Sequence, residues 1–85
     1  MNYAECKKIR EDNNHLLNTI ITYDKTDYLV QKIIIIPPNE AKIFLAHYET
    51  NENAETVFMS RKDLMPMLIC INQTTNIEAI IPFEL

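Results

Sequence analysis

The sequence predicts an α+β domain in which one N-terminal amphipathic helix packs on an antiparallel meander sheet of four or five strands. Apolar residues recur every three or four positions over residues 3–21, which is the period of a helix. From residue 28 onward the chain turns to β-branched and aromatic runs. Short polar segments separate these runs and favour antiparallel neighbours over crossovers. We expect the 85 residues to form a single domain, 1–85.

The predicted helix covers residues 3–21. Asn2 and Glu5 form a capping pattern at its start. Asn13 interrupts the apolar stripe, and its side chain either bonds nearby backbone or water or fixes the register of a helix–helix contact. The stripe itself comprises Tyr3, Cys6, Ile9, Leu16, Leu17, Ile20 and Ile21.

Five strands follow in the prediction, after a polar link at residues 22–27. The first is apolar on both faces near its end, as in a central strand, and Pro37 ends it because proline cannot donate to a ladder. Ser60 and Asp63 indicate a capped helical turn through about residue 65, and a longer proline-kinked helix over 60–72 is the alternative. The predicted strands are residues 28–36, 41–49, 56–59, 67–72 and 77–83, with turns at 50–55 and 73–76.

The chain contains no glycine. Glycine supplies the positive φ angles and close backbone approach that several phosphate-binding motifs require. A P-loop, a dinucleotide fingerprint, an EF-hand loop and a nucleophile elbow of the usual form are therefore excluded. Asparagine can replace glycine at left-handed turn positions, and the candidates are Asn39, Asn51, Asn53, Asn72 and Asn76.

The chain carries 8 basic and 12 acidic residues, a formal net charge of −4. This balance disfavours nucleic-acid binding, which needs clustered Lys and Arg. The N-terminal segment lacks the apolar core of a signal peptide, and no apolar run reaches the ~18–20 residues that span a bilayer. We therefore expect a cytoplasmic protein without membrane association, in which Cys6 and Cys70 are reduced thiols buried in the core.

Metal and catalytic sites are not expected. Cys6 and His15 lie on opposite sides of the predicted helix, and no other pair has the spacing of zinc ligands. His47, with Glu49 nearby, is the best general-base candidate, yet no further group converges on it. We predict no cofactor and no enzymatic activity, and an enzyme centred on His47 and Glu49 is the least favoured hypothesis.

One short segment could bind an anion. Ser60, Arg61 and Lys62 combine a predicted helix start with two cations, although a capped turn with solvated charges gives the same pattern. If the segment binds a ligand, the protein is a sequestering protein for an anionic metabolite or nucleotide, acting as an oligomer. This is the alternative functional hypothesis.

The leading hypothesis is a protein-interaction module. One helix cannot cover all the apolar surface of the predicted strands, and uncovered apolar sheet surface marks association sites. We therefore expect homo-oligomers, another protein partner, or both. The composition resembles that of small phage or mobile-element accessory proteins, which suggests binding and inhibition or modulation of a host protein. The predicted partner-binding residues are Ile43, Leu45, Ile77, Ile80 and Phe83.

Overall fold

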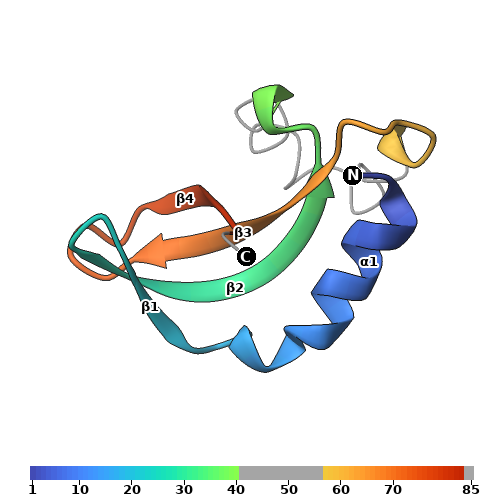
Figure 1. The fold of residues 1–85 in the computed structure, drawn as a ribbon. Helices are drawn as coiled ribbons and strands as arrows, with labels where there is room; N and C mark the ends of the chain where they lie inside the picture. The colour runs from blue at the N-terminus through green and yellow to red at the C-terminus, as the bar shows by residue number, and fades with distance from the viewer. Residues whose placement is uncertain (41–56, 84–85) are drawn as a thin grey trace.

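The computed structural model describes residues 1–40 and 57–83, which form a helix and a four-stranded antiparallel sheet (Figure 1). The sheet order is β1-β2-β3-β4, so each strand neighbours the next along the chain. This confirms the predicted α+β class and the antiparallel meander. The elements are α1 (Tyr3–Asp12), the 3-10 turn η1 (Asn14–Leu16), β1 (Ile20–Tyr23), β2 (Thr26–Ile36), the 3-10 turn η2 (Pro38–Glu40), β3 (Met65–Asn72) and β4 (Glu78–Pro82).

α1 begins where the sequence predicts and ends well before residue 21. At its start, the Glu5 N–H donates to the Asn2 side chain at 2.9 Å and the Asn2 N–H donates to the Glu5 carboxylate at 3.1 Å. At its end, Asn13 Nδ2 donates to the Ile9 carbonyl at 2.8 Å. Asparagine competes in this way with the helical hydrogen bonds. Of the two interpretations of Asn13, bonding to nearby backbone is confirmed.

The second half of the predicted helix is wrong, because residues from Ile20 onward pair with β2 instead. Ile20 lies opposite Leu29 and Tyr23 lies opposite Thr26, so the predicted polar link at residues 22–27 is a β-hairpin. Ile20 and Ile21 also fit the apolar period of the preceding helix. Only their pairing with a neighbouring strand shows that they belong to a strand and not to the helix.

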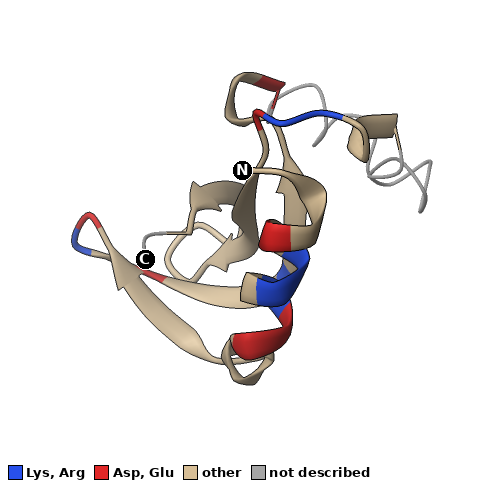
Figure 2. Ribbon diagram, turned by 45° about the vertical axis from the view of Figure 1, so that its right-hand side comes forward, with Lys and Arg blue, Asp and Glu red and all other residues tan. Residues whose placement is uncertain are grey.

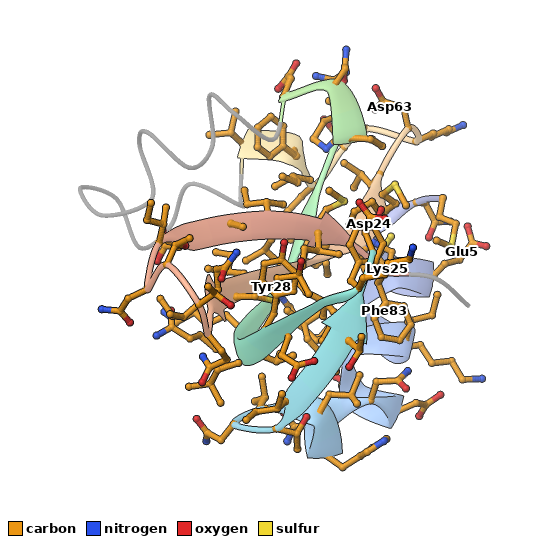
Figure 3. The ribbon with its side chains drawn as sticks, turned by 90° about the vertical axis from the view of Figure 1, so that its left-hand side faces the viewer. Glu5, Asp24, Lys25, Tyr28, Asp63 and Phe83 are labelled. Atoms are coloured by element: carbon orange, nitrogen blue, oxygen red, sulfur yellow. The ribbon has the colours of Figure 1, made fainter. Side chains whose placement is uncertain are left out.

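The turn of this hairpin consists of Asp24 and Lys25, which lie at the tip that points toward the viewer in Figure 3. Both have positive φ, 49° and 64°. A two-residue turn with two positive φ angles is of type I′ and suits the twist of the flanking strands. Asn-Gly is the preferred sequence for it, so a chain without glycine holds this turn under strain.

β2 and β3 form the centre of the sheet, and their apolar side chains are buried on both faces. The strands pair from Tyr28↔Asn72 to Ile36↔Met65, with a register shift between Val30 and Lys32. We define the α1 face as the face on which α1 packs. It carries Val30, Ile33, Ile35, Leu68, Cys70 and Ile81. The opposite face carries Ile34, Ile36, Met67 and Ile69.

α1 covers only one end of the α1 face. Cys6 is 0% exposed and packs with Ile35 and Leu64. The other end of that face is covered by partly buried side chains from η1, β1 and the segment after β4, among them Leu17, Ile21 and Phe83. The helix is therefore one of several covers of the sheet.

Pro66 lies inside β3, where the sequence predicts the end of a helical turn. Its carbonyl accepts from the Phe83 N–H at 3.2 Å, so its backbone groups face β4. The missing N–H of proline therefore falls at the end of the β3–β4 ladder, and no hydrogen bond to β2 is lost. This placement lets β3 begin at Met65, two residues before the predicted strand.

Other predictions for the connection between β2 and β3 have mixed outcomes. The predicted strand 41–49 and turn 50–55 lie outside the described residues. The predicted strand 56–59 is wrong for its described part, because Val57 and Phe58 form a 3-10 turn. The predicted helical turn from Ser60 is also wrong, since residues 61–64 contain bends and β3 follows directly.

The predicted strand 77–83 is confirmed as β4.

Asparagine does take left-handed positions, as predicted for a chain without glycine. Asn76 has φ of 60° in the β3–β4 turn, which confirms that candidate. Asn18, which the sequence analysis did not single out, has φ of 65° just before β1. Asn39 lies in η2 and Asn72 lies in β3, and neither is among the positive-φ residues.

The strained turn leads to a stability prediction. We expect Lys25→Gly to raise the free energy of unfolding by about 0.5–1 kcal/mol, because glycine adopts positive φ without a steric cost. Thermal unfolding should show a rise in Tm of several degrees. As a control, Ala4→Gly in α1 should lower the stability by about 1 kcal/mol. A Lys25→Gly protein no more stable than the wild type would contradict the assigned strain.

Candidate functional site

An open hollow of about 240 Å³ lies on the α1 face between the two edge strands. We call it the edge groove. β1 and β4 supply its walls and buried Leu68 of β3 supplies its floor. Its lining residues are Leu16, Ile21, Thr22, Tyr23, Leu68, Ile81, Pro82 and Phe83.

Strand alternation places the apolar side chains in this groove. In β1, Ile21 and Tyr23 are half-buried while Ile20 and Thr22 are exposed. Phe83, labelled in Figure 3, continues the β3–β4 ladder and contributes its ring to the cluster around Leu68. These residues continue the hydrophobic core outward to the molecular surface.

The edge groove is lined mainly by apolar side chains. Its polar side chains are Thr22 and Tyr23, and the Thr22 hydroxyl already donates to Asp27 Oδ1 at 2.8 Å. Its volume is below the ~300–1,000 Å³ typical of sites for small molecules. A space of this size has room for one or two side chains.

The predicted partner-binding residues lie in different places. Phe83 lines the edge groove, and Ile80 packs against the core on the opposite face of the sheet. Ile77 is 65% exposed at the turn before β4. Ile43 and Leu45 lie outside the described residues. Leu16, Ile21 and Tyr23 were not predicted as binding residues, because the first two were placed in a helix and the third in a polar link.

One helix was predicted to leave apolar strand surface uncovered, yet much of that surface is buried in the single chain. Residues 33–36 and Ile81 are each at most 6% exposed. The prediction is therefore wrong for these residues, because both faces of the β2–β3 pair are enclosed. The exposed large apolar residues of the described part are Met1, Ile20, Val57, Met59 and Ile77.

The predicted anion site forms an ion-pair cluster. Arg61 Nε donates to Asp63 Oδ1 at 2.9 Å, Nη1 donates to Glu40 Oε1 at 2.9 Å, and Nη2 donates to Asp63 Oδ2. The bonds to Asp63 and then Glu40 raise the pKa of the guanidinium. Ser60 and Lys62 are exposed. An anion at Arg61 would have to compete with two carboxylates, so this geometry gives the anion-binding prediction no support.

A second hollow, of about 150 Å³, lies where α1 meets β2 and is lined by Arg10, Asn14, Leu17, Lys32 and Ile33. Arg10 Nη1 donates to the Ile33 carbonyl at 3.5 Å and Nη2 donates to the Tyr3 hydroxyl at 3.5 Å. β1 pairs with β2 only as far as Leu29. Arg10 therefore contacts the β2 edge beyond the end of β1, which is a structural role.

The described residues contain no group of three or more His, Cys, Asp or Glu side chains that could hold a metal ion. Cys6 and Cys70 are buried and are not joined in a disulfide, as predicted. Burial raises the pKa of the Cys70 thiol to about 11, which keeps it protonated and unreactive at neutral pH. His47 and Glu49 lie outside the described residues.

Charged residues of both signs are interspersed over the described surface. In Figure 2, α1 is acidic near its start, basic in its middle and acidic at its end, and the hairpin tip carries one residue of each sign. Across residues 1–40 and 57–83, no helix is long and apolar enough to cross a membrane.

The Arg61 cluster leads to a prediction about pH. The hydrogen bond from Arg61 lowers the pKa of Asp63 below its ordinary value of 3.8. A carboxylate with a lowered pKa stabilises the folded state at neutral pH, and this contribution is lost as the pH falls through the folded-state pKa. We expect Asp63→Asn to lower the urea midpoint at neutral pH and to have a smaller effect in strong acid. A difference that is independent of pH would contradict this role.

The chain matches no protein-family model, no curated protein and no solved structure in three comparisons.

Proposed function

We propose that the protein is a small acidic protein-interaction module, and that its edge groove receives an apolar side chain of a partner protein. The observation that carries this proposal is the edge groove itself. It is open, its floor is a buried core residue, and its walls are aliphatic and aromatic. Central apolar pockets that receive an anchoring side chain are typical of binding hot spots.

The energetics suit a side-chain anchor. Full burial of a Leu, Ile, Met or Phe side chain is worth about 1.5–3 kcal/mol. Tyr23 and Phe83 add aromatic edges, and aromatic residues are enriched in the centres of protein interfaces. One anchor of this kind changes affinity by roughly a factor of ten to one hundred.

The charge of the chain favours a basic partner. A net charge of −4 raises the association rate with a basic surface without fixing the contact geometry. Binding, inhibition or modulation of a host protein by a phage-like accessory protein in the cytoplasm is consistent with this charge and with the composition. The alternative, sequestration of an anionic metabolite or nucleotide, has weaker support because Arg61 is paired with Asp63 and Glu40.

We expect Leu16→Glu to weaken this binding. Leu16 lines the edge groove, is only half-buried and is absent from the buried core clusters, so a charge there should leave the fold intact. The probe is a library of random peptides displayed on phage and selected on the purified protein. Enriched peptides should share an apolar anchor residue and should bind Leu16→Glu at least about tenfold more weakly.

The matched control is Ile20→Glu, which places the same charge at an exposed isoleucine outside the groove. It should bind the selected peptides like the wild type. Two-dimensional NMR spectra of each variant verify the fold, and shift changes on peptide addition should map to the lining of the groove. The proposal fails if no peptide is enriched, or if folded Leu16→Glu binds as well as Ile20→Glu.

A further inference from the structure

The outer edge of β4 carries backbone groups that no described residue pairs with. Phe83 N–H donates to the Pro66 carbonyl and Asn72 N–H donates to the Ile77 carbonyl. Residues 77 and 83 therefore direct their backbone groups toward β3, and by alternation residues 79 and 81 do so as well. Glu78, Ile80 and Pro82 direct theirs away from the sheet.

This edge can pair with a copy of itself. Ile80 lies midway between Glu78 and Pro82, the other two residues whose backbone groups face away from the sheet. A two-fold axis next to Ile80 places β4 antiparallel to β4 of a second copy. Ile80 N–H of each copy then donates to the Ile80 carbonyl of the other. Glu78 N–H donates to the Pro82 carbonyl of the other copy. Proline lacks an N–H, so the ladder ends there.

The side chains are also complementary in this register. On the α1 face, Ile77 lies opposite Phe83 of the second copy, and Ala79 lies opposite Ile81. On the other face, Ile80 lies beside Ile80 and Glu78 lies beside Pro82. Exposed Ile77 gains an aromatic neighbour, small Ala79 faces a large residue, and like charges do not face each other.

The other edge strand is less suited to such pairing. Val30 N–H donates to the Thr19 carbonyl, so the backbone groups of residue 19 face β2. By alternation, Ile20 and Thr22 are the two residues of β1 whose backbone groups face away from the sheet. Asn18 and Asp24 flank the strand with φ of 65° and 49°. These two residues with positive φ end the extended backbone on both sides of β1. The edge at β1 is therefore shorter than the edge at β4, where the hydrogen bonds to β3 run from residue 77 to residue 83.

We propose that two copies of this chain associate through the outer edge of β4, in an antiparallel register centred on Ile80, and join the four-stranded sheets of their described residues into one continuous sheet. A two-fold axis makes the contact isologous and closed. The contact is a strand edge, smaller than the ~1,200–2,000 Å² of stable complexes, so the dimer is weak. It brings Ile77 of the second copy next to Phe83, which also lines the edge groove, and it does not depend on the proposed binding there.

Site-directed cross-linking tests the register. In an antiparallel hydrogen-bonded pair the Cα atoms are about 5.5 Å apart, within the range of a disulfide. Ile80→Cys should therefore give a covalent dimer under mild oxidation, while buried Cys6 and Cys70 stay reduced. Ile77→Cys is the control, because its counterpart in the second copy lies six residues along the strand, about 20 Å away. Equal cross-linking of both variants, or none of either, overturns the proposal.

Sedimentation equilibrium of the unmodified chain, up to about 1 mM, tests the dimer without chemistry. We expect a monomer–dimer equilibrium in which Ile77→Lys raises the dissociation constant at least about tenfold. Ile20→Lys, at a similarly exposed isoleucine on the other edge strand, should leave it unchanged. A monomer at every concentration overturns the proposal. These measurements use the purified chain alone, so the result is separate from that of peptide binding to the edge groove.

Discussion

The pairing of β2 with β3 is the interaction on which the rest of the structure depends. These two strands are apolar on both faces, and their paired residues from position 30 to 36 and from 66 to 70 make up most of the buried core. Two apolar faces need two sets of covers. On the α1 face, α1 covers one end, and the hairpin strand β1 and the segment after β4 cover the other end. On the opposite face, Phe58, Met65 and Ile80 pack against the core.

This arrangement determines which apolar side chains and backbone groups lie at the surface of the described residues. The central pair is enclosed, and among the described residues the large exposed apolar side chains lie on or beside the edge strands (Ile20, Ile77), at the N-terminus (Met1) and in the segment before β3 (Val57, Met59). The edge groove is where the covers from β1 and β4 leave a hollow over the core. The outer side of β4 is an edge of the sheet, where the backbone groups pair with no described residue. The two features use different chemistry, side-chain burial in the groove and backbone hydrogen bonds at the edge.

Polar residues shape the molecule through local backbone chemistry. Asn13 ends α1 by bonding the Ile9 carbonyl, and Asn18 turns the chain into β1 with a positive φ. Arg61 forms ion pairs with both Asp63 and Glu40. These ion pairs hold the segment that precedes β3 next to the segment that follows β2. The segment that the sequence suggested as an anion-binding site thus connects two parts of the chain through ion pairs. Sequence spacing could not reveal it, because Glu40 lies 21 residues before Arg61.

The sequence by itself determined the fold class, the capped start of α1, the central strand through Ile36 and the proline stop after it. These features depend on local chemistry: side-chain period, capping and the lack of a proline N–H. Only the tertiary structure decided that Ile20 and Ile21 belong to a strand, that Pro66 is tolerated in β3, and that Ile21, Tyr23 and Phe83 meet in one groove. An isoleucine pair fits a helix or a strand equally well, and the choice is made by the neighbour that buries it.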